Sequence, residues 1–296
     1  MRAPGTPGGV IVRAAPRPGI RGAGPAAAAV LTQALLAANA LLVVLPLVFM
    51  VLSSLKSTRE IFQRPFALPL APRWDNYTQL WSAAHFALYF RNSVVVTVAS
   101  MALILTTGTL AAFALGRYRF RGNDLVYLFF LSGIMVPIRL AIIPLFIMMR
   151  DLRLLDTLAS LVLVYAASGL PSAVFILTGF FRALPQDLDS AARIDGAGEA
   201  AILLRVLLPL VRPALAIVTV YNIIPIWNDF FFPLVFTHAE RVKTVPLGLT
   251  VFFGEYATNW AALFAGLTLS AAPVLLLYVL MSRQFIKGLT AGAVKG

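Results

Sequence analysis

The stretch Leu184–Ala214 reads LPQDLDSAARIDGAGEAAILLRVLLPLVRPA and is the longest mixed polar segment between two long apolar runs. It begins like a helix, with a proline and two aspartates ahead of an alanine pair, and Gly196 breaks that helix. A second helix is expected over 197–207, ending at Pro209. Two short helices around a glycine would form a docking knob, although periodicity alone also allows an ordinary connecting loop.

The composition around this stretch is that of an integral membrane protein. The chain has 296 residues, of which 60% are hydrophobic and 12% charged, with a mean hydropathy of +0.87. Soluble domains carry about 25% charged residues. A net charge of +12 would suggest nucleic-acid binding in a soluble protein, but membrane proteins collect Lys and Arg in their cytoplasmic loops. We therefore expect no nucleic-acid partner.

No pattern in the sequence indicates bond chemistry. There is no cysteine, which excludes disulfides and thiolate ligands, and the two histidines, His85 and His238, are far apart. His-Glu-x-x-His, Gly-x-Ser-x-Gly and Walker-type phosphate loops are absent from the sequence. The expectation is no catalytic residue, no metal and no cofactor, so any ATPase would be a separate polypeptide.

The chain before the second apolar run divides into three parts. Residues 1–25 are rich in Arg, Pro, Gly and Ala, which predicts a disordered basic tail. Residues 26–55 carry no charge and exceed the core of a signal peptide, the rival interpretation, so we expect an uncleaved first span. Residues 56–91 are polar and broken by prolines, which predicts an external loop with a short helix starting at Asp75–Asn76.

Five further apolar runs make up an expected core over 92–281. They cover about 92–116, 125–149, 161–181, 214–236 and 260–281. A membrane helix needs about 20 residues, so the sequence predicts an all-α membrane protein with six transmembrane helices. A polar loop, 184–213, separates the fourth and fifth spans, and residues 282–296 form a C-terminal tail.

The distribution of cations predicts the orientation of these spans. With the N-terminus inside, the inner segments carry 14 Lys and Arg residues and the outer segments carry nine. Cytoplasmic loops are the richer in Lys and Arg. We therefore expect both termini, and the loop 184–213, on the cytoplasmic side.

Two charged residues, Arg139 and Asp229, fall inside expected spans. At about 1.5 Å per residue both lie roughly 21–23 Å from the inner face. Charges at such depth usually face a partner or a wet cavity, so we hypothesise that they pair or face one water-filled path. Alternatively, Arg139 reaches outward and Asp229 caps a broken helix near Pro233.

The spacing within the opening stretch resembles the signature loop of ATP-binding-cassette importer permeases, which reads Glu-Ala-Ala, three residues, Gly, nine residues, Ile-x-Leu-Pro. Ala191, Ala192, Gly196, Leu208 and Pro209 match this pattern, and Val206 stands for the Ile. The family's Glu falls on Ser190, with Asp189 beside it. The surrounding sequence is similar to the carbohydrate, maltose-type branch.

This resemblance implies a type I importer permease core whose loop 184–213 is a coupling helix that docks on the ATPase. The implied coupling residues are Asp189, Ser190, Ala191, Ala192, Asp195, Gly196, Ala197 and Pro209. Trp227-Asn228-Asp229 resembles a fifth-span motif of sugar-uptake permeases, and Arg139, Tyr221 and Asn222 complete a candidate substrate path. The tail 285–296 resembles the family's C-terminus, which reaches toward the ATPase dimer.

The resemblance implies one permease subunit of an ATP-driven sugar importer in the bacterial inner membrane. Its implied partners are a second permease, two ATP-binding subunits, an extracytoplasmic solute-binding protein, membrane lipid and a sugar. The same machine could carry a glycerol phosphodiester, another phosphate ester, a peptide or an amino acid. A secondary transporter or channel is a further alternative, which would predict internal repeats or several intramembrane acids.

Overall fold

The computed structural model describes residues 25–83, 85–252 and 258–293, and every regular element in these ranges is a helix. The expected tail 1–25 lies almost wholly outside them, as do the side chains of the expected tail 282–296. Two compact units divide the chain, Met1–Val48 and Phe49–Gly296. The described part of the first unit is the beginning of α1 (Pro25–Ser54), an apolar helix.

The second unit holds the remaining helices. In chain order they are α2 (Thr58–Gln63), α3 (Asp75–Ala83), α4 (Phe86–Arg117), α5 (Asn123–Met135), η1 (Ile138–Ala141), α6 (Ile142–Asp151), α7 (Leu158–Ala183), α8 (Asp187–Ile194), α9 (Glu199–Ala201), η2 (Ile202–Leu207), α10 (Leu208–Leu210), α11 (Arg212–Asn228), α12 (Phe231–Phe236), η3 (Glu240–Val242), α13 (Val245–Gly248), η4 (Leu249–Phe252) and α14 (Trp260–Ala293). The short helix expected at Asp75–Asn76 is α3.

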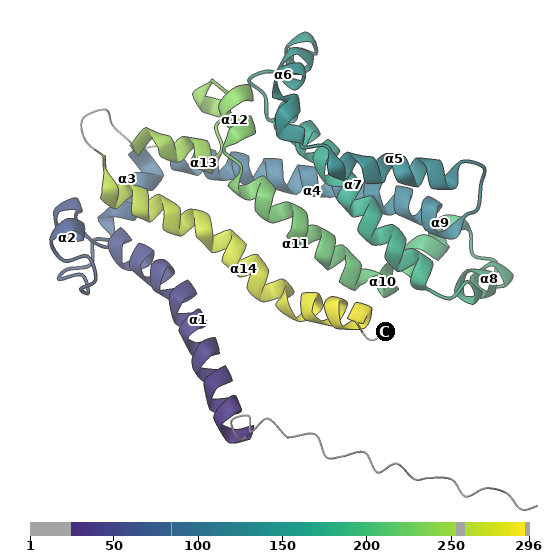
Figure 1. Ribbon diagram of the computed structural model, residues 1–296. Coiled ribbons are helices and arrows are strands. Elements are labelled where there is room, and N and C mark those ends of the chain that lie inside the picture. Colours follow the sequence, from purple (N-terminus) through teal and green to yellow (C-terminus); the bar gives the residue numbers. More distant parts are fainter. Residues whose placement is uncertain (1–24, 84, 253–257, 294–296) are drawn as a thin grey trace, which may run out of the picture. The chain divides into compact units, whose positions relative to one another are not determined.

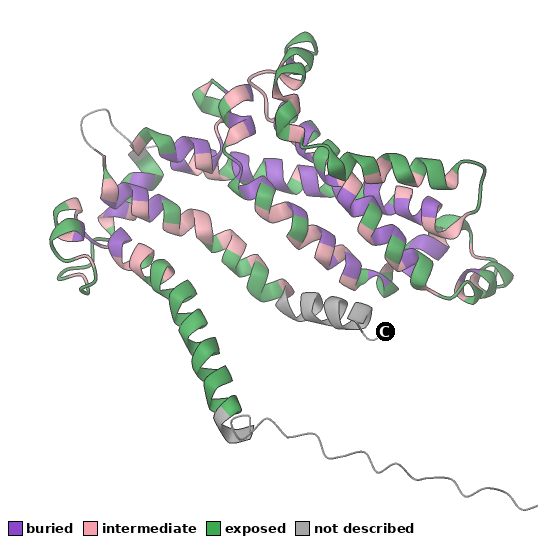
Figure 2. Ribbon diagram, viewed as in Figure 1, coloured by how far each residue is buried: buried purple, intermediate pink, exposed green. Residues whose placement is uncertain are grey.

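The pair α4 and α7 forms the centre of the second unit, and α11 packs against both and against α14 (Figure 1). A Cβ on Gly108 of α4 would lie 2.9 Å from Ala173 Cβ of α7, so the absent side chain lets the two backbones approach closely. Ile104, Leu177 and Phe181 are fully buried between these helices. Figure 2 shows the buried residues running along α4, α7 and α11.

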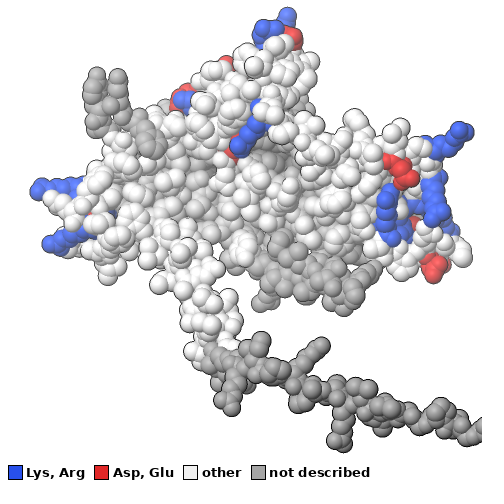
Figure 3. All heavy atoms as spheres, in the orientation of Figure 1, with Lys and Arg blue, Asp and Glu red and all other residues white. Residues whose placement is uncertain are grey.

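Four helices of the described chain are long and apolar enough to cross a membrane, and the number rises to six if each bent pair is one span. The four are the Ala28–Ser54 part of α1, α4, α7 and the Trp260–Met281 part of α14. On the face drawn in Figure 3, many of the charged side chains lie at the two ends, and the surface between them is mostly uncharged. This distribution suits a protein that crosses a bilayer.

The expected third and fifth spans are not continuous helices. α5 and the segment Ile138–Asp151 are bent by 83° around Val136 and Pro137. Proline disfavours the helical conformation in the preceding residue, and Val136 is accordingly extended (ψ 113°). The fifth span, expected over 214–236, breaks around Asp229, because α11 ends at Asn228 and α12 begins at Phe231. The second span begins at Phe86, six residues earlier than expected.

Candidate functional site

The knob, defined here as residues 185–211, has two helical arms joined at Gly196. The first arm, α8, ends where the Gly196 N–H donates to Arg193 O (3.0 Å) and the Ala197 N–H donates to Ala192 O (2.9 Å). Gly196 has a φ of +82°, a conformation that residues with a Cβ seldom adopt. The two helices around a glycine that the sequence predicts are therefore present.

The second arm differs from its expected form. It starts at Glu199 and passes through the π-helical turn η2, where Leu208 N–H bonds to Leu203 O. The expected stop at Pro209 is wrong, because the arm continues to Leu210 and bends at Val211 before α11. Proline lacks an N–H, so the helical hydrogen-bond ladder loses one bond at Pro209, directly after the π-helical turn.

The eight expected coupling residues differ in how far they are exposed. Ser190, Ala191, Asp195, Gly196 and Pro209 are exposed, whereas Ala192 and Ala197 are half-buried. Ile194, which the sequence did not single out, is 87% exposed on the same arm. Asp189 is the exception among the eight, because its side chain is 7% exposed. Its carboxylate is thus unavailable for docking in this conformation.

Asp189 is buried because it pairs with Arg117, the last residue of α4. The Arg117 Nε and Nη2 atoms donate to the two carboxylate oxygens, each at 2.8 Å. The Arg117 side chain is 2% exposed, so the pair is shielded from water and from salt. A bidentate arginine–carboxylate pair of this kind fixes the relative orientation of α4 and α8.

A second, exposed cluster links the arms of the knob. Arg193 Nε on α8 donates to Glu199 Oε1 at 3.0 Å, and the Tyr118 hydroxyl donates to Glu199 Oε2. These bonds from Arg193, and then from Tyr118, lower the pKa of the Glu199 carboxyl. Burial, and then the Glu199 carboxylate, raise the pKa of Tyr118. Glu199 is therefore a carboxylate, and Tyr118 a neutral donor, at physiological pH.

Asp229 and Arg139 form an ion pair, as hypothesised from their depth. Arg139 Nη2 lies 3.6 Å from Asp229 Oδ1, and the arginine side chain is 70% exposed while the aspartate side chain is 6% exposed. Asp229 Oδ2 also accepts the Tyr165 hydroxyl (2.8 Å) and the Phe232 N–H (3.0 Å). Asp229 thus pairs with Arg139 and also caps α12, so the two alternatives hold together.

The other expected path residues lie in different surroundings. Asn222 is buried and donates to Ser172 Oγ of α7 (3.4 Å), and the Trp227 indole N–H donates to Ser270 O of α14 (2.9 Å). Both side chains therefore serve packing between helices. Tyr221, 58% exposed, and the exposed Asn228 remain accessible from outside this chain.

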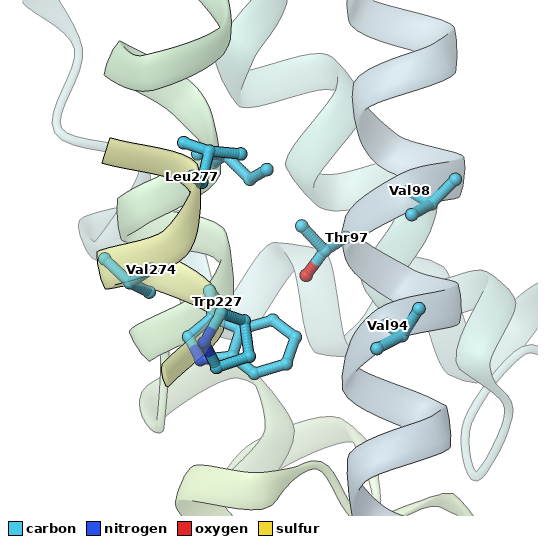
Figure 4. Close-up of a pocket in the computed structure, with 8 residues that line it drawn as sticks. Val94, Thr97, Val98, Trp227, Val274 and Leu277 are labelled. Carbon is cyan, nitrogen blue, oxygen red and sulfur yellow. The ribbon is translucent and has the colours of Figure 1, made fainter. Parts of the chain in front are cut away.

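An apolar cavity of about 180 Å³ lies between α4, α11 and α14 (Figure 4). Val94, Thr97 and Val98 line it from α4, and Trp227 and Val274 line it from the other two helices. With a single hydroxyl among these groups, the cavity offers little to a polar solute. In the described ranges, no group of three or more His, Asp or Glu side chains could hold a metal ion.

Sequence reasoning missed Arg117, Tyr118 and Tyr165. Arg117 is one of three closely spaced arginines at positions 117, 119 and 121, and its partner Asp189 lies 72 residues away. Tyr165 stands in an apolar run without any local signal of its contact with Asp229, 64 residues later. Only the packing of α4, α7 and α11 brings these groups together.

Comparison with known proteins identifies the family of this chain. Residues 104–291 match the family model described as binding-protein-dependent transport system inner membrane component. A diacetylchitobiose uptake system permease of Streptomyces coelicolor is 36% identical over 266 residues, covering 89% of this chain and 88% of that protein. A melibiose/raffinose/stachyose import permease of Bacillus subtilis is 30% identical over 253 residues, covering 85% and 91%.

A solved structure has the same fold. The crystal structure of a bacterial ABC transporter involved in the import of the acidic polysaccharide alginate contains a chain with a TM-score of 0.76 and 25% identity. The match covers 87% of this chain and 96% of that one, which confirms the all-α, type I permease fold. Since the family model spans more than half of the sequence and the relatives align along most of it, the chain belongs to the binding-protein-dependent transport system inner membrane components.

Proposed function

We propose that the chain forms half of the translocation pathway of an ATP-driven sugar importer and that its knob converts ATPase motion into alternating access. The observation that carries this is the knob itself. Its exposed face includes Ser190, Ala191, Ile194 and Asp195. This face lies next to a turn in which Gly196 has a positive φ, a conformation that glycine adopts readily. Membership in the family makes the chain a transport subunit, so ATP hydrolysis belongs to separate subunits.

The family works as an assembly, and the chain's own features support particular places for its partners. The cation count supports a cytoplasmic knob and cytoplasmic termini. In that orientation, two ATP-binding subunits meet the knobs of this chain and of a second permease. A solute-binding protein delivers the substrate to the loops on the opposite side.

Sugars are the cargo that the relatives' names favour, with diacetylchitobiose and melibiose or raffinose among them. Tyr221 and Asn228 support this, because an exposed aromatic ring and an exposed amide suit the C–H faces and hydroxyls of a sugar. The Arg139–Asp229 pair lines the path beside them in this proposal. Arg139 is the member that reaches solvent.

Cross-linking tests the docking of the knob, because the chain has no native cysteine. We expect Ile194→Cys to cross-link to an ATP-binding subunit when the complex is purified from its native membrane. Arg153→Cys, an exposed position in the α6–α7 turn at the other end of α7, is the matched control and should give no such product. Cross-linking from Arg153 and none from Ile194 would contradict the proposal.

The cargo is tested with the solute-binding protein that copurifies. Diacetylchitobiose and raffinose are offered in turn to the reconstituted complex, and the binding-protein-dependent rate of ATP hydrolysis is measured. Stimulation by such a saccharide is the expected result. Stimulation by a glycerol phosphodiester or a peptide instead would exclude sugar as the cargo, and transport without ATP would indicate a secondary transporter.

A further inference from the structure

We propose that Arg117 and Tyr118, at the end of α4, form a grip that makes α4 follow the knob as one rigid body. The grip is these two residues together with Asp189 and Glu199, which they hold. This inference rests on the proposed coupling function of the knob. It assigns the transmission of motion to residues outside the signature loop.

The Arg117 half of the grip uses every donor that a guanidinium has. Besides the two bonds to Asp189, Nη1 donates to Phe181 O (2.9 Å) and Leu184 O (2.8 Å), and Nη2 donates to Pro185 O (2.9 Å). One side chain thus binds the last carbonyls of α7 and the first turn of α8. Lysine, with a compact ammonium group, cannot reproduce this planar arrangement.

The Tyr118 half holds the other arm. Its hydroxyl donates to Glu199 at the start of α9, and its ring packs edge-to-face on Phe113 of α4 with centroids 5.4 Å apart. Arg193 on the first arm bonds to the same carboxylate. Two consecutive residues therefore hold the two arms on either side of Gly196.

The grip gives the knob a path into the core that the chain connection does not provide. Along the sequence, the knob is joined only to α7 and α11. α4 is a continuous helix of 32 residues, about 48 Å long at 1.5 Å per residue, and it packs more extensively against α7 than against any other element. A displacement of α8 or α9 would act directly on this helix.

The far end of α4 is held in the same manner. Asn92 Nδ2 donates to Arg241 O and Lys243 O, each at 2.9 Å, and Ser93 Oγ accepts the Val245 N–H at 2.9 Å. These contacts join α4 to the segment between α12 and α14. In Figure 1, α13 and α8 lie near opposite ends of α4, so one helix connects the knob with the loop segment on the other side.

A spin-label distance measurement tests whether the grip makes α4 and the knob move together, or whether Arg117 only caps the end of α7. Labels are placed at Leu110→Cys on α4, which is 59% exposed, and at the exposed Asp187→Cys on α8. The full complex is studied without nucleotide and with ATP and vanadate. If α4 and the knob move as one body, the distance between these labels is narrow and equal in both states.

Arg117→Lys is the decisive variant. We expect its label distance to broaden and to become nucleotide-dependent, and transport per ATP to fall about tenfold, within the usual range of coupling free energies. Arg119→Lys is the matched control, since Arg119 is exposed and makes no ion pair or side-chain hydrogen bond with the described residues. Tyr118→Phe, which removes only the hydroxyl that bonds to Glu199, tests the Tyr118 half of the grip without risk to folding.

The outcomes separate this inference from the proposed function. Failure of Ile194→Cys to cross-link in an otherwise unchanged chain would refute docking by the knob. Cross-linking that persists in Arg117→Lys and Tyr118→Phe, with an unchanged label distance in both, would refute the grip alone. A distance that already changes with nucleotide in the labelled parent chain would also refute it.

Discussion

Gly196 supplies a backbone angle to the knob. A Cβ at this position would meet no atom within 4 Å, so steric fit does not require glycine. The φ of +82° does, because a left-handed conformation costs other residues about 1–2 kcal/mol. Asparagine and aspartate adopt this conformation more readily than other residues that carry a side chain.

This predicts a graded series at position 196. Gly196→Val should abolish ATP-driven transport, Gly196→Asp should impair it by adding charge as well as strain, and Gly196→Asn should retain most of it. The measurement is substrate uptake by proteoliposomes that contain equal amounts of assembled complex. Full transport by Gly196→Val would show that the turn has no part in coupling.

Asp229 and Arg139 make unequal contributions to their pair. Arg139 is largely exposed and 3.6 Å away, so its loss should cost less than about 1 kcal/mol of stability. Asp229→Ala would leave the buried Tyr165 hydroxyl without its acceptor, at a cost of about 1–3 kcal/mol.

We therefore expect Asp229→Ala to lower the thermal stability of the complex, and both Arg139→Gln and Asp229→Asn to reduce uptake. Asp229→Asn is the matched variant, because its amide oxygen can still accept from the Tyr165 hydroxyl and the Phe232 N–H. Unchanged assembly and uptake in Arg139→Gln and in Asp229→Asn would remove the pair from the substrate path.

At the scale of elements, a proline inside an apolar run has two different effects in this chain. Pro137 breaks the third span, but Pro171 lies inside the continuous helix α7. Pro171 Cγ would lie 2.8 Å from a Cβ on Gly133, so a close helix packs against it. Both prolines are visible in the sequence. Whether the helix continues through a proline depends on the neighbouring helices, because they determine whether the backbone groups that lose a hydrogen bond there can be accommodated. The six apolar runs were predictable, and the break near Asp229 was one of two alternatives, but the break at Val136 and Pro137 was not predicted.

Asp156 joins two loops, and its contribution depends on pH. Its Oδ1 accepts the N–H groups of Ala239 (2.8 Å) and His238 (2.6 Å), and the Asp156 N–H donates to Phe236 O. The bond from Ala239 is the main cause that lowers the pKa of this carboxyl below 3.8, and burial opposes it. The stabilisation is therefore present above pH 3.8 and is lost as the pH falls through the lower folded value.

Asp156→Asn keeps an acceptor and removes the charge, so it mimics the protonated state. We expect its melting temperature to lie below that of the parent chain near neutral pH, and the two values to converge under acidic conditions. Thermal unfolding in detergent across this range provides the measurement. A difference that stays constant with pH would mean that the charge of Asp156 contributes nothing.

At the scale of the whole molecule, the sequence predicted the fold class because span length and hydropathy are local properties. The type I arrangement came from the resemblance in the signature loop, and the likeness to the alginate importer confirms it. The grip could not be predicted, since its contacts join residues 72 and 81 positions apart. Likewise, the exposure of Ile194 and the burial of Asp189 depend on how α8 sits against α4.

The grip also has a consequence for evolution. Selection would act on Arg117 and Asp189 as one inherited unit, because an arginine buried without its carboxylate is costly. Lineages that replace Asp189 should replace Arg117 as well, whereas Ser190, on the exposed face, should vary with the ATPase gene instead. Exchange of knobs between related permeases should then succeed only when the end of α4 is exchanged with them.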